Sequence, residues 1–200
     1  MNKHVRPEEF ENATQAAEGW PRRRWTIDEV FKAQAAGIFK PRERFELIGG
    51  EIVPMSPKGI RHETLKSDLV MYWGKRRPAW LKFAPETTFH LSKTDVPEPD
   101  LVVFASSTDL ADLDGKSALL VVEVSDTTLV KDSTLKVKLY AEFGVREYWV
   151  VNAKTLVTTV HKDPEGSGYR TVVKIKGNKR LVPEAAPELA VCLSNIPIDG

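Results

Sequence analysis

The chain has 200 residues, a length that suits one folded domain with a substantial core. Its formal net charge is +1, so any basic surface for nucleic acid would have to be local. The single cysteine, Cys192, excludes an internal disulfide and a zinc site built from several cysteines, and it favours a reducing, cytoplasmic compartment. No apolar run approaches the ~20 residues of a membrane span, and the first residues lack a signal-peptide core, so we expect no membrane association.

The first part of the chain predicts a polar arm followed by a short helix. Residues 1–24 are mostly polar and are expected to form an N-terminal arm, with residues 25–200 forming a single domain. The stretch "TIDEVFKAQAAG" has Thr26 as a helix N-cap, Glu29 three residues later and Gly37 as a stop signal. These residues together predict a helix with a capping box.

The rest of the chain predicts a small sheet between helices. Two apolar runs flank Gly49-Gly50, which is typical of a two-residue hairpin turn. Residues 61–76 carry apolar side chains at helical spacing, and residues 130–143 predict a second helix that ends at Gly144. Strands are expected at residues 82–90, 100–104, 118–124, 147–151, 156–161 and 169–175. The pattern predicts a mixed α/β fold with an antiparallel extension late in the chain.

Two carboxylates lie in segments whose apolar composition predicts buried strands. Asp100 stands in "PEPDLVVF" and Glu123 stands in the middle of "LLVVEVSD". Because burial of an unpaired carboxylate is costly, Glu123 is either the partner of a buried Arg or Lys or a functional group, and buried ionisable groups cluster at functional sites. Asp100 taken alone is explained equally well by a Pro-Asp pair that opens a strand after a turn.

The helix expected at residues 130–143 adds a third polar residue to this pair. Its apolar arc, at about 100° per residue, comprises Leu135, Val137, Leu139, Tyr140 and Phe143. Lys136 and Asp132 fall inside this arc, so Lys136 should point at the sheet, where Glu123 and Asp100 are the nearest anions in chain order. The alternative is a surface pair of Lys136 with Asp132, worth only ~0.3–0.5 kcal/mol. That alternative does not explain the inward direction of the pair.

Two carboxylates and a lysine at one sheet edge suit phosphodiester hydrolysis. Carboxylate oxygens bind Mg²⁺ or Mn²⁺, and such a metal lowers the pKa of its water and offsets the charge on a phosphate. The lysine would position the attacking hydroxide. If the carboxylates repel each other in an empty site, Asp100→Asn should leave the melting temperature unchanged or raise it.

The order of these residues resembles the PD-(D/E)xK nuclease superfamily. The Pro-Asp pair at 99–100 is followed by Glu123 and then by a lysine, as in the motif of that superfamily. The chain is most similar to one branch, the Uma-two family of restriction-endonuclease-like proteins. Its successive blocks resemble "RFELIGGEIVPMSPKGIRH", "PEPDLVVF", "VVEVSDTTLVKD" and "KVKLYAEFGVREYWVVN". The likeness runs from about residue 25 to about residue 195, and the spaced set is more specific than any single block.

The resemblance implies a restriction-endonuclease-like core, which is a mixed β-sheet flanked by helices, together with dependence on a divalent metal and DNA as the substrate. It assigns Asp100 to the aspartate of the motif and Glu123 to its second acid, as metal ligands and catalytic residues. The lysine of the superfamily usually stands two residues after the second acid, where this chain has Ser125. In this branch the lysine has moved to the following helix, and Lys136 fits that position.

Further residues are candidates for the same site. Glu46, amid apolar neighbours in the first hairpin strand, is either an edge-strand residue facing water or an additional metal ligand, since the superfamily often takes an acid from an early element. His62 stands at the start of the helix at residues 61–76, and a capping or packing role is favoured over contact with a phosphate or transfer of a proton. The supporting residues of the site are His62, Ser125, Asp132 and Tyr140.

The predicted function is therefore hydrolysis of DNA by a metal-dependent endonuclease, which as a homodimer would cut both strands. Basic residues at 22–24, 75–77 and 174–180 could follow a phosphate backbone, although surface charges are usually just solvated. One alternative is a catalytically inactive nucleic-acid- or protein-binding module on the same fold. Another is a metal hydrolase acting on a different substrate. The endonuclease requires Asp100, Glu123 and Lys136 to converge, whereas the binding module needs only the basic surface.

Overall fold

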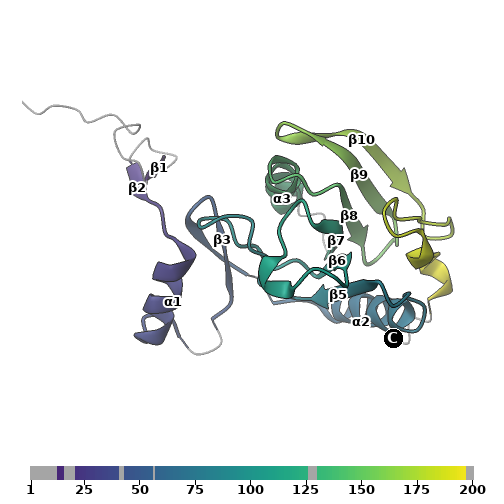
Figure 1. The fold of residues 1–200 in the computed structure, drawn as a ribbon, viewed down its shortest axis with the longest axis horizontal. Coiled ribbons are helices and arrows are strands. Elements are labelled where there is room, and N and C mark those ends of the chain that lie inside the picture. Colours follow the sequence, from purple (N-terminus) through teal and green to yellow (C-terminus); the bar gives the residue numbers. More distant parts are fainter. Residues whose placement is uncertain (1–12, 16–20, 41–42, 56, 126–129, 197–200) are drawn as a thin grey trace, which may run out of the picture. The chain divides into compact units, whose positions relative to one another are not determined.

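The computed structural model describes residues 13–15, 21–40, 43–55, 57–125 and 130–196. The chain divides into two compact units (Figure 1), one formed by residues 1–56 and 90–98 and the other by residues 57–89 and 99–200. The predicted boundary between an arm and a single domain at residue 25 stays a prediction. Among the described helices, none is both long and apolar enough to cross a membrane.

The first unit contains a capped helix and a hairpin, and both confirm the sequence prediction. Helix α1 (Ile27–Ala35) begins with a capping box, in which the Glu29 N–H donates to Thr26 Oγ1 at 3.4 Å and the Thr26 N–H donates to the Glu29 carboxylate at 3.0 Å. Strands β3 (Phe45–Ile48) and β4 (Glu51–Pro54) pair antiparallel. Gly49-Gly50 joins them at φ angles of 61° and 78°, which glycine adopts without steric cost.

A small core and a second strand pair complete the described part of this unit. Val30 of α1 packs with Leu47 of β3 and with Val96, and all three side chains are buried. Leu47 and Val96 also exchange backbone hydrogen bonds, which ties residues 90–98 to the hairpin. The short strands β1 (Ala13–Gln15) and β2 (Pro21–Arg23) pair antiparallel.

The second unit is built on a six-stranded mixed sheet in the order β10-β9-β8-β7-β6-β5 (Figure 1). Only β7 and β8 run parallel, and helix α3 (Val130–Glu142) provides the crossover that a parallel pair requires. The strands are β5 (Leu81–Pro85), β6 (Leu101–Ala105), β7 (Ala118–Ser125), β8 (Glu147–Asn152), β9 (Thr158–Glu165) and β10 (Gly168–Ile175). This arrangement confirms the predicted α/β class and its antiparallel extension from β8 to β10.

The two long helices of this unit cover opposite faces of the sheet. Helix α2 (Ile60–Gly74) packs Trp73 against Trp149 of β8, with ring centroids 6.2 Å apart. Helix α3 packs Tyr140 edge-on against Tyr148, the preceding residue of β8, at 4.9 Å. Successive side chains of a strand point to opposite faces, so α2 and α3 lie on different sides. The pairing of β7 with β8 places Glu123 on the α3 face.

The C-terminal segment closes the core next to α2. Trp73 Nε1 donates a hydrogen bond to the Leu189 carbonyl at 2.8 Å, and Leu181 pairs with Val191 in an isolated bridge. The segment is mostly loop, with two short 3₁₀ turns at Pro187–Leu189 and Leu193–Asn195. A third such turn, Leu110–Asp112, lies between β6 and β7.

Three local predictions are wrong. The strand expected at residues 82–90 ends at Pro85, because Glu86 has a φ of 48° and turns the chain. Asp100 lies in a bend immediately before β6 rather than inside a strand. Leu135 is 59% exposed, because the inward stripe of α3 runs through Lys136 and Tyr140 and leaves Leu135 at its edge.

Candidate active site

Asp100 lies immediately before β6, and Glu123 lies in β7, the strand that pairs with β6. Strand β6 pairs antiparallel with β7, and Leu101 lies opposite Val122. Asp100 immediately precedes Leu101, so continuing this register by one step brings it opposite Glu123. Asp100 Oδ2 also accepts a hydrogen bond from the backbone N–H of Val124 at 2.7 Å, which holds Asp100 against β7. The fold therefore brings both predicted carboxylates to one end of the β6–β7 pair.

Asp100 is buried and is held by side chains from the start of α2. Its side chain is 2% exposed. Lys58 Nζ donates a hydrogen bond to Asp100 Oδ1 at 2.8 Å, and His62 Nε2 lies 2.9 Å from Oδ2. Lys58 lies in the loop before α2 and His62 lies in the first turn of the helix. Asp100 is thus paired and hydrogen-bonded, which are the conditions under which a buried charge is tolerated.

These partners keep Asp100 ionised. Burial alone would raise the pKa of Asp100, but the hydrogen bond and charge of His62, followed by those of Lys58, outweigh burial and lower the pKa to about 2. Burial alone would lower the pKa of His62, but the hydrogen bond and charge of Asp100 outweigh it and raise that pKa. His62 Nδ1 lies 3.1 Å from Glu63 Oε1. Both ring nitrogens therefore face carboxylates, which suits the doubly protonated imidazolium.

The repulsion between the carboxylates stays a prediction, but Asp100 has positive partners that this prediction did not include. A carboxylate destabilised by a neighbouring anion has a raised pKa, whereas the pKa of Asp100 is lowered. Lys58 and His62 supply the positive charge that the sequence alone did not place there. Asp100→Asn is therefore expected to lower the stability of the fold instead of leaving it unchanged or raising it.

Glu123 is held by helix α3. Lys136 Nζ donates a hydrogen bond to Glu123 Oε1 at 2.8 Å, and the Tyr140 hydroxyl lies 3.1 Å from the same oxygen. Lys136 and Tyr140 are four residues apart, so they are neighbours on one face of the helix. The Lys136 side chain is 15% exposed and points toward the sheet, as its place inside the helical arc predicted. Its catalytic role stays a prediction.

Asp100 also belongs to a wider set of alternating charges, which we call the α2 charge cluster. Lys58 Nζ donates to Glu86 Oε1 at 2.7 Å as well as to Asp100. Lys66 Nζ donates to Glu86 Oε1 and to Glu63 Oε2, each at 2.8 Å. The cluster consists of Lys58, His62, Glu63, Lys66, Glu86 and Asp100, which are three acids and three bases. Its formal charges balance when His62 is protonated.

The carboxylates at the edge of this cluster are stabilised by the same lysines. Hydrogen bonds from Lys58 and Lys66, which outweigh burial, lower the pKa of Glu86 to about 2. Burial alone would raise the pKa of Glu63, but the hydrogen bond and charge of Lys66 outweigh it and lower that pKa. The three acids of the cluster are therefore all stabilised in their ionised form.

The sequence reasoning missed Lys58, Lys66 and Glu86. Lys66 lies on the same helical stripe as His62 and Trp73, so the argument that turned Lys136 inward would also have turned Lys66 inward. Lys58 lies in a loop and Glu86 in a turn, and neither carries a periodic signal. Only the fold brings these two residues to Asp100.

The other predicted residues have different surroundings. Glu46 lies in the first unit, is 6% exposed and accepts a hydrogen bond from the Glu98 N–H at 2.7 Å, so it does not face water. Its role as a metal ligand stays a prediction. Ser125 is the last residue of β7, and strand alternation places it on the face of Glu123. His62 is buried, as a packing residue would be, and pairs with Asp100. The side chain of Asp132 lies outside the described residues.

The chemistry of this donor set fits a hard divalent cation. Mg²⁺ is commonly bound through one or two carboxylates, with water and phosphate oxygens completing its coordination. Asp100 and Glu123 are the carboxylates predicted for this role, and their service as metal ligands stays a prediction. Within the described ranges, no group of three or more His, Cys, Asp and Glu side chains is placed to hold a metal by itself. The protein would therefore contribute two carboxylates and leave the remaining positions to water and substrate.

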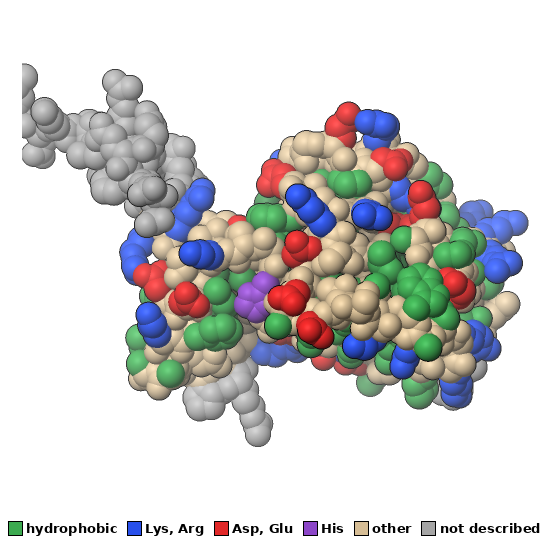
Figure 2. All heavy atoms as spheres, viewed as in Figure 1, with side chains coloured by type: hydrophobic (Ala, Val, Ile, Leu, Met, Phe, Trp, Pro, Cys, Tyr) green, Lys and Arg blue, Asp and Glu red, His purple; other side chains and the backbone are tan. Residues whose placement is uncertain are grey.

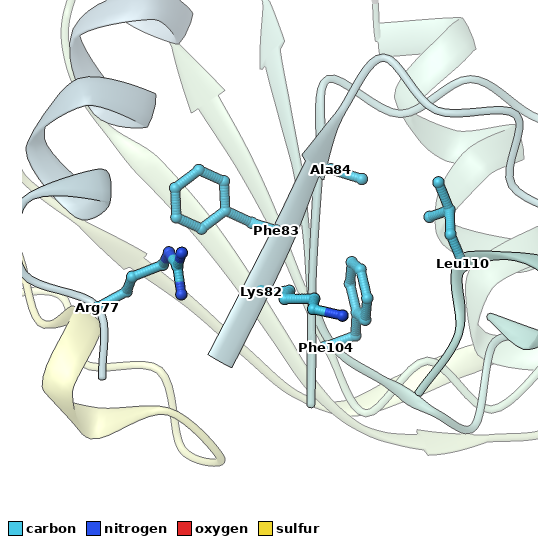
Figure 3. A pocket seen from close by; sticks show the side chains of 6 residues that line it. All are labelled: Arg77, Lys82, Phe83, Ala84, Phe104 and Leu110. Carbon is cyan, nitrogen blue, oxygen red and sulfur yellow. The ribbon is translucent and has the colours of Figure 1, made fainter. Parts of the chain in front are cut away.

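A cavity of about 250 Å³ lies elsewhere on the second unit (Figure 3). Its lining residues are Arg77, Lys82, Phe83, Ala84, Phe104 and Leu110. Strand β5 pairs Lys82 with Phe104, whereas Pro85 pairs with Leu101 beside Asp100. Figure 3 shows Phe83 and Lys82 on opposite sides of β5. The cavity is therefore displaced along the strand from the carboxylates, and the candidate chemistry does not lie in it.

Two arginines of the predicted basic cluster at residues 75–77 contact neighbouring parts of the chain. Arg77 Nη1 donates to the Leu81 carbonyl at 2.8 Å, and the Arg76 guanidinium lies 3.7 Å from the centre of the Tyr72 ring. These arginines are thus engaged with neighbouring parts of the chain. On the face drawn in Figure 2, Lys and Arg side chains are interspersed with Asp and Glu. A track for a phosphate backbone stays a prediction.

Comparison with known proteins gives a family and a fold. The model of the Uma2 family, whose description is "Putative restriction endonuclease", matches residues 28–195. A crystal structure of "a putative nuclease belonging to DUF820" from Anabaena variabilis matches with a TM-score of 0.61 and 16% sequence identity, covering 86% of this chain and 96% of that chain. At that identity the match confirms the fold alone. No curated protein matches the chain.

Proposed function

We propose that this chain, which belongs to the Uma2 family, is a metal-dependent endonuclease that hydrolyses phosphodiester bonds in DNA. The observation that carries the proposal is the placement of Asp100 and Glu123 at one end of the β6–β7 pair, with the Lys136 ammonium 2.8 Å from Glu123. Two carboxylates and a lysine are the groups that metal-assisted hydrolysis of a phosphodiester requires. The nuclease-like fold and the family agree with this reading.

Each residue has a separate role in the proposed reaction. Asp100 and Glu123 would hold Mg²⁺ or Mn²⁺, which when bound lowers the pKa of a water and offsets the charge on a phosphate. Lys136 would orient the attacking water through its ammonium group. Tyr140 holds Glu123 in place through its hydroxyl, and His62 together with the Val124 N–H fixes Asp100 Oδ2.

Cleavage of plasmid DNA tests the proposal directly. We expect the wild-type protein to nick or linearise plasmid in Mg²⁺ or Mn²⁺, and Glu123→Ala to lose this activity. The matched control is Glu147→Gln, because Glu147 is a buried carboxylate of the same sheet that pairs with Trp149 and Lys162 instead. Cleavage by Glu147→Gln together with its loss in Glu123→Ala would support the proposal. Absence of cleavage by the wild type on every form of DNA would contradict it.

One observation favours a second candidate, a binding module without turnover. The Asp100 charge is already met by Lys58, His62 and the Val124 N–H, so the fold does not need a metal to neutralise it. Mn²⁺ binding measured by calorimetry separates the two candidates. The endonuclease requires binding that is lost in Asp100→Asn, whereas the module requires none.

Two further features of the proposed enzyme are carried over from the sequence. A homodimer that cuts both strands and a cytoplasmic location both stay predictions. Sedimentation of the purified protein with and without DNA would measure the first. Fractionation of cells that produce the protein would measure the second.

A further inference from the structure

The two oxygens of Asp100 are engaged differently. Oδ2 accepts the Val124 N–H at 2.7 Å and faces His62 Nε2 at 2.9 Å, which together occupy its acceptor capacity. Among the described residues, Oδ1 is met by Lys58 alone, at 2.8 Å. Oδ1 therefore keeps one acceptor position, and a cation that binds there lies beside the Lys58 ammonium and repels it.

Lys58 is better able to leave Asp100 than His62 is. His62 is fixed in the first turn of α2, and its second nitrogen faces Glu63 at 3.1 Å. Lys58 precedes the helix and carries its charge on a flexible four-carbon side chain. Its Nζ is also held by Glu86 at 2.7 Å, so departure from Asp100 does not leave a buried ammonium without a partner.

The positive charge that a bound cation adds to the site determines where the Lys58 ammonium moves. Lys58 and His62 already face Asp100, and Lys136 faces Glu123. A divalent cation adds two positive charges that these residues do not offset. A phosphodiester supplies negative charge at that position, and a freed lysine is a strong donor to a phosphate oxygen.

We propose that Lys58 is a further substrate-contacting residue, which pairs with Asp100 Oδ1 in the metal-free protein and moves to a non-bridging phosphate oxygen of DNA when a divalent cation takes Oδ1. This inference rests on the proposed function. Glu86 is a positioning residue, because it holds Lys58 on both sides of the exchange, and Lys66 in turn holds Glu86. Metal and DNA consequently bind cooperatively, because each offsets a charge that the other leaves exposed.

Metal binding by the DNA-free protein tests the first half of the exchange. Lys58→Met removes the competing ammonium, so Mn²⁺ affinity measured by calorimetry should rise about tenfold or more. The matched control is Lys162→Met, because Lys162 also faces a buried carboxylate of the sheet, Glu147 at 3.5 Å. That control should bind Mn²⁺ like the wild type, and Asp100→Asn should lose binding.

DNA binding tests the second half. A short fluorescein-labelled duplex is titrated with protein in Ca²⁺ and in EDTA, and its anisotropy is recorded. Lys58→Met should weaken binding about tenfold in Ca²⁺, because a charge-assisted hydrogen bond to phosphate is lost, and should change it little in EDTA. Lys58→Gln, which keeps a hydrogen-bonding group for Asp100 and Glu86, should behave in the same way and serves if the methionine variant fails to fold.

The variants distinguish the inference from the proposed function. If Asp100→Asn loses Mn²⁺ binding while the Lys58 variants bind Mn²⁺ and DNA like the wild type, the role of Lys58 is refuted and the metal site stands. If Asp100→Asn binds Mn²⁺ like the wild type, the metal site itself is refuted, and the inference falls with it. Tighter Mn²⁺ binding combined with weaker Ca²⁺-dependent DNA binding supports the exchange.

Discussion

Asp100 immediately precedes β6 and Glu123 lies in the neighbouring strand β7, yet the two halves of the site are built differently. Asp100 is 2% exposed and is held by a backbone N–H of β7 and by two side chains from the start of α2. The Glu123 side chain is 15% exposed and is met by two side chains of α3. The comparison teaches that Asp100 is tied more deeply into the fold than Glu123, whose partners come from a single helix and leave it more exposed.

The largest effect should come from the α3 half of the site. Lys136→Ala should reduce the cleavage rate about 10²–10³-fold while leaving metal affinity roughly intact, because the proposed role of Lys136 is to orient the attacking water and not to bind the metal. Adding Ser125→Lys should restore part of the rate, since residue 125 lies on the same face of β7 as Glu123. Recovery should be incomplete, because a displacement of about 1 Å matters for such chemistry. Rates are compared at fixed Mg²⁺.

The control for this experiment is Lys138→Ala, two residues along the same helix. The Lys138 side chain is exposed, so its removal changes the helix charge but not the site. A wild-type cleavage rate in Lys136→Ala would remove Lys136 from the mechanism. An equal loss in both variants would point to a general effect of charge on DNA binding.

The stability difference between the halves should be the next largest effect. Asp100→Asn should lower the free energy of unfolding by about 3 kcal/mol, because it leaves Lys58 and His62 in a buried cluster without their anion. Glu123→Gln should cost about 1 kcal/mol, because Glu123 is more exposed and an amide oxygen can still accept a hydrogen bond. Denaturant unfolding at neutral pH measures both values. Equal losses would mean that the two carboxylates are held alike.

The pH dependence of stability should show how much the charge of Asp100 contributes to the free energy of unfolding. The pKa of Asp100 is about 2 in the folded protein, below its ordinary value of 3.8, so its charge stabilises the fold above about pH 4. This contribution, about 2 kcal/mol, is lost as the pH falls from about 4 to about 2. The raised pKa of His62 acts in the opposite direction. The charge of His62 stabilises the fold below the ordinary histidine pKa of 6.5, and this stabilisation is lost as the pH rises through the raised pKa.

Unfolding of the wild type and of Asp100→Asn across this acid range measures the contribution. The stability difference between the two proteins should shrink toward pH 2, where the wild-type carboxylate becomes protonated. A difference that stays constant from pH 5 to pH 2 would show that the loss in Asp100→Asn does not arise from the carboxylate charge.

The smallest effect should come from the hydroxyl that supports Glu123. Tyr140→Phe keeps the ring packing on Tyr148 and removes the hydrogen bond to Glu123 Oε1. We expect a loss of about 0.5–1.5 kcal/mol in stability and a severalfold drop in cleavage rate with little change in DNA affinity. Separate measurement of kcat and KM distinguishes the loss of rate from a loss of DNA affinity. A stability loss without any rate loss would make Tyr140 a packing residue only.

The sequence by itself determined the elements and one half of the site. Local signals, such as the Thr26 capping box and the Gly49-Gly50 turn, act between residues that are close in the chain, so they can be read without the fold. The same holds for Lys136, because a helix has a fixed period and an inward lysine contradicts its apolar arc. Alternation along β7 likewise fixed the face of Glu123 once the strand was recognised.

Only the tertiary structure decided how Asp100 is neutralised. Lys58 and Glu86 lie in a loop and a turn, and they reach Asp100 from 42 residues and 14 residues away along the chain. Whether two charged residues interact depends on the distance between them in space. For residues outside helices and strands, no periodic pattern in the sequence encodes that distance. The sign of the Asp100 pKa shift depends on these partners, which is why the sequence predicted repulsion where the folded protein provides a balanced cluster of charges.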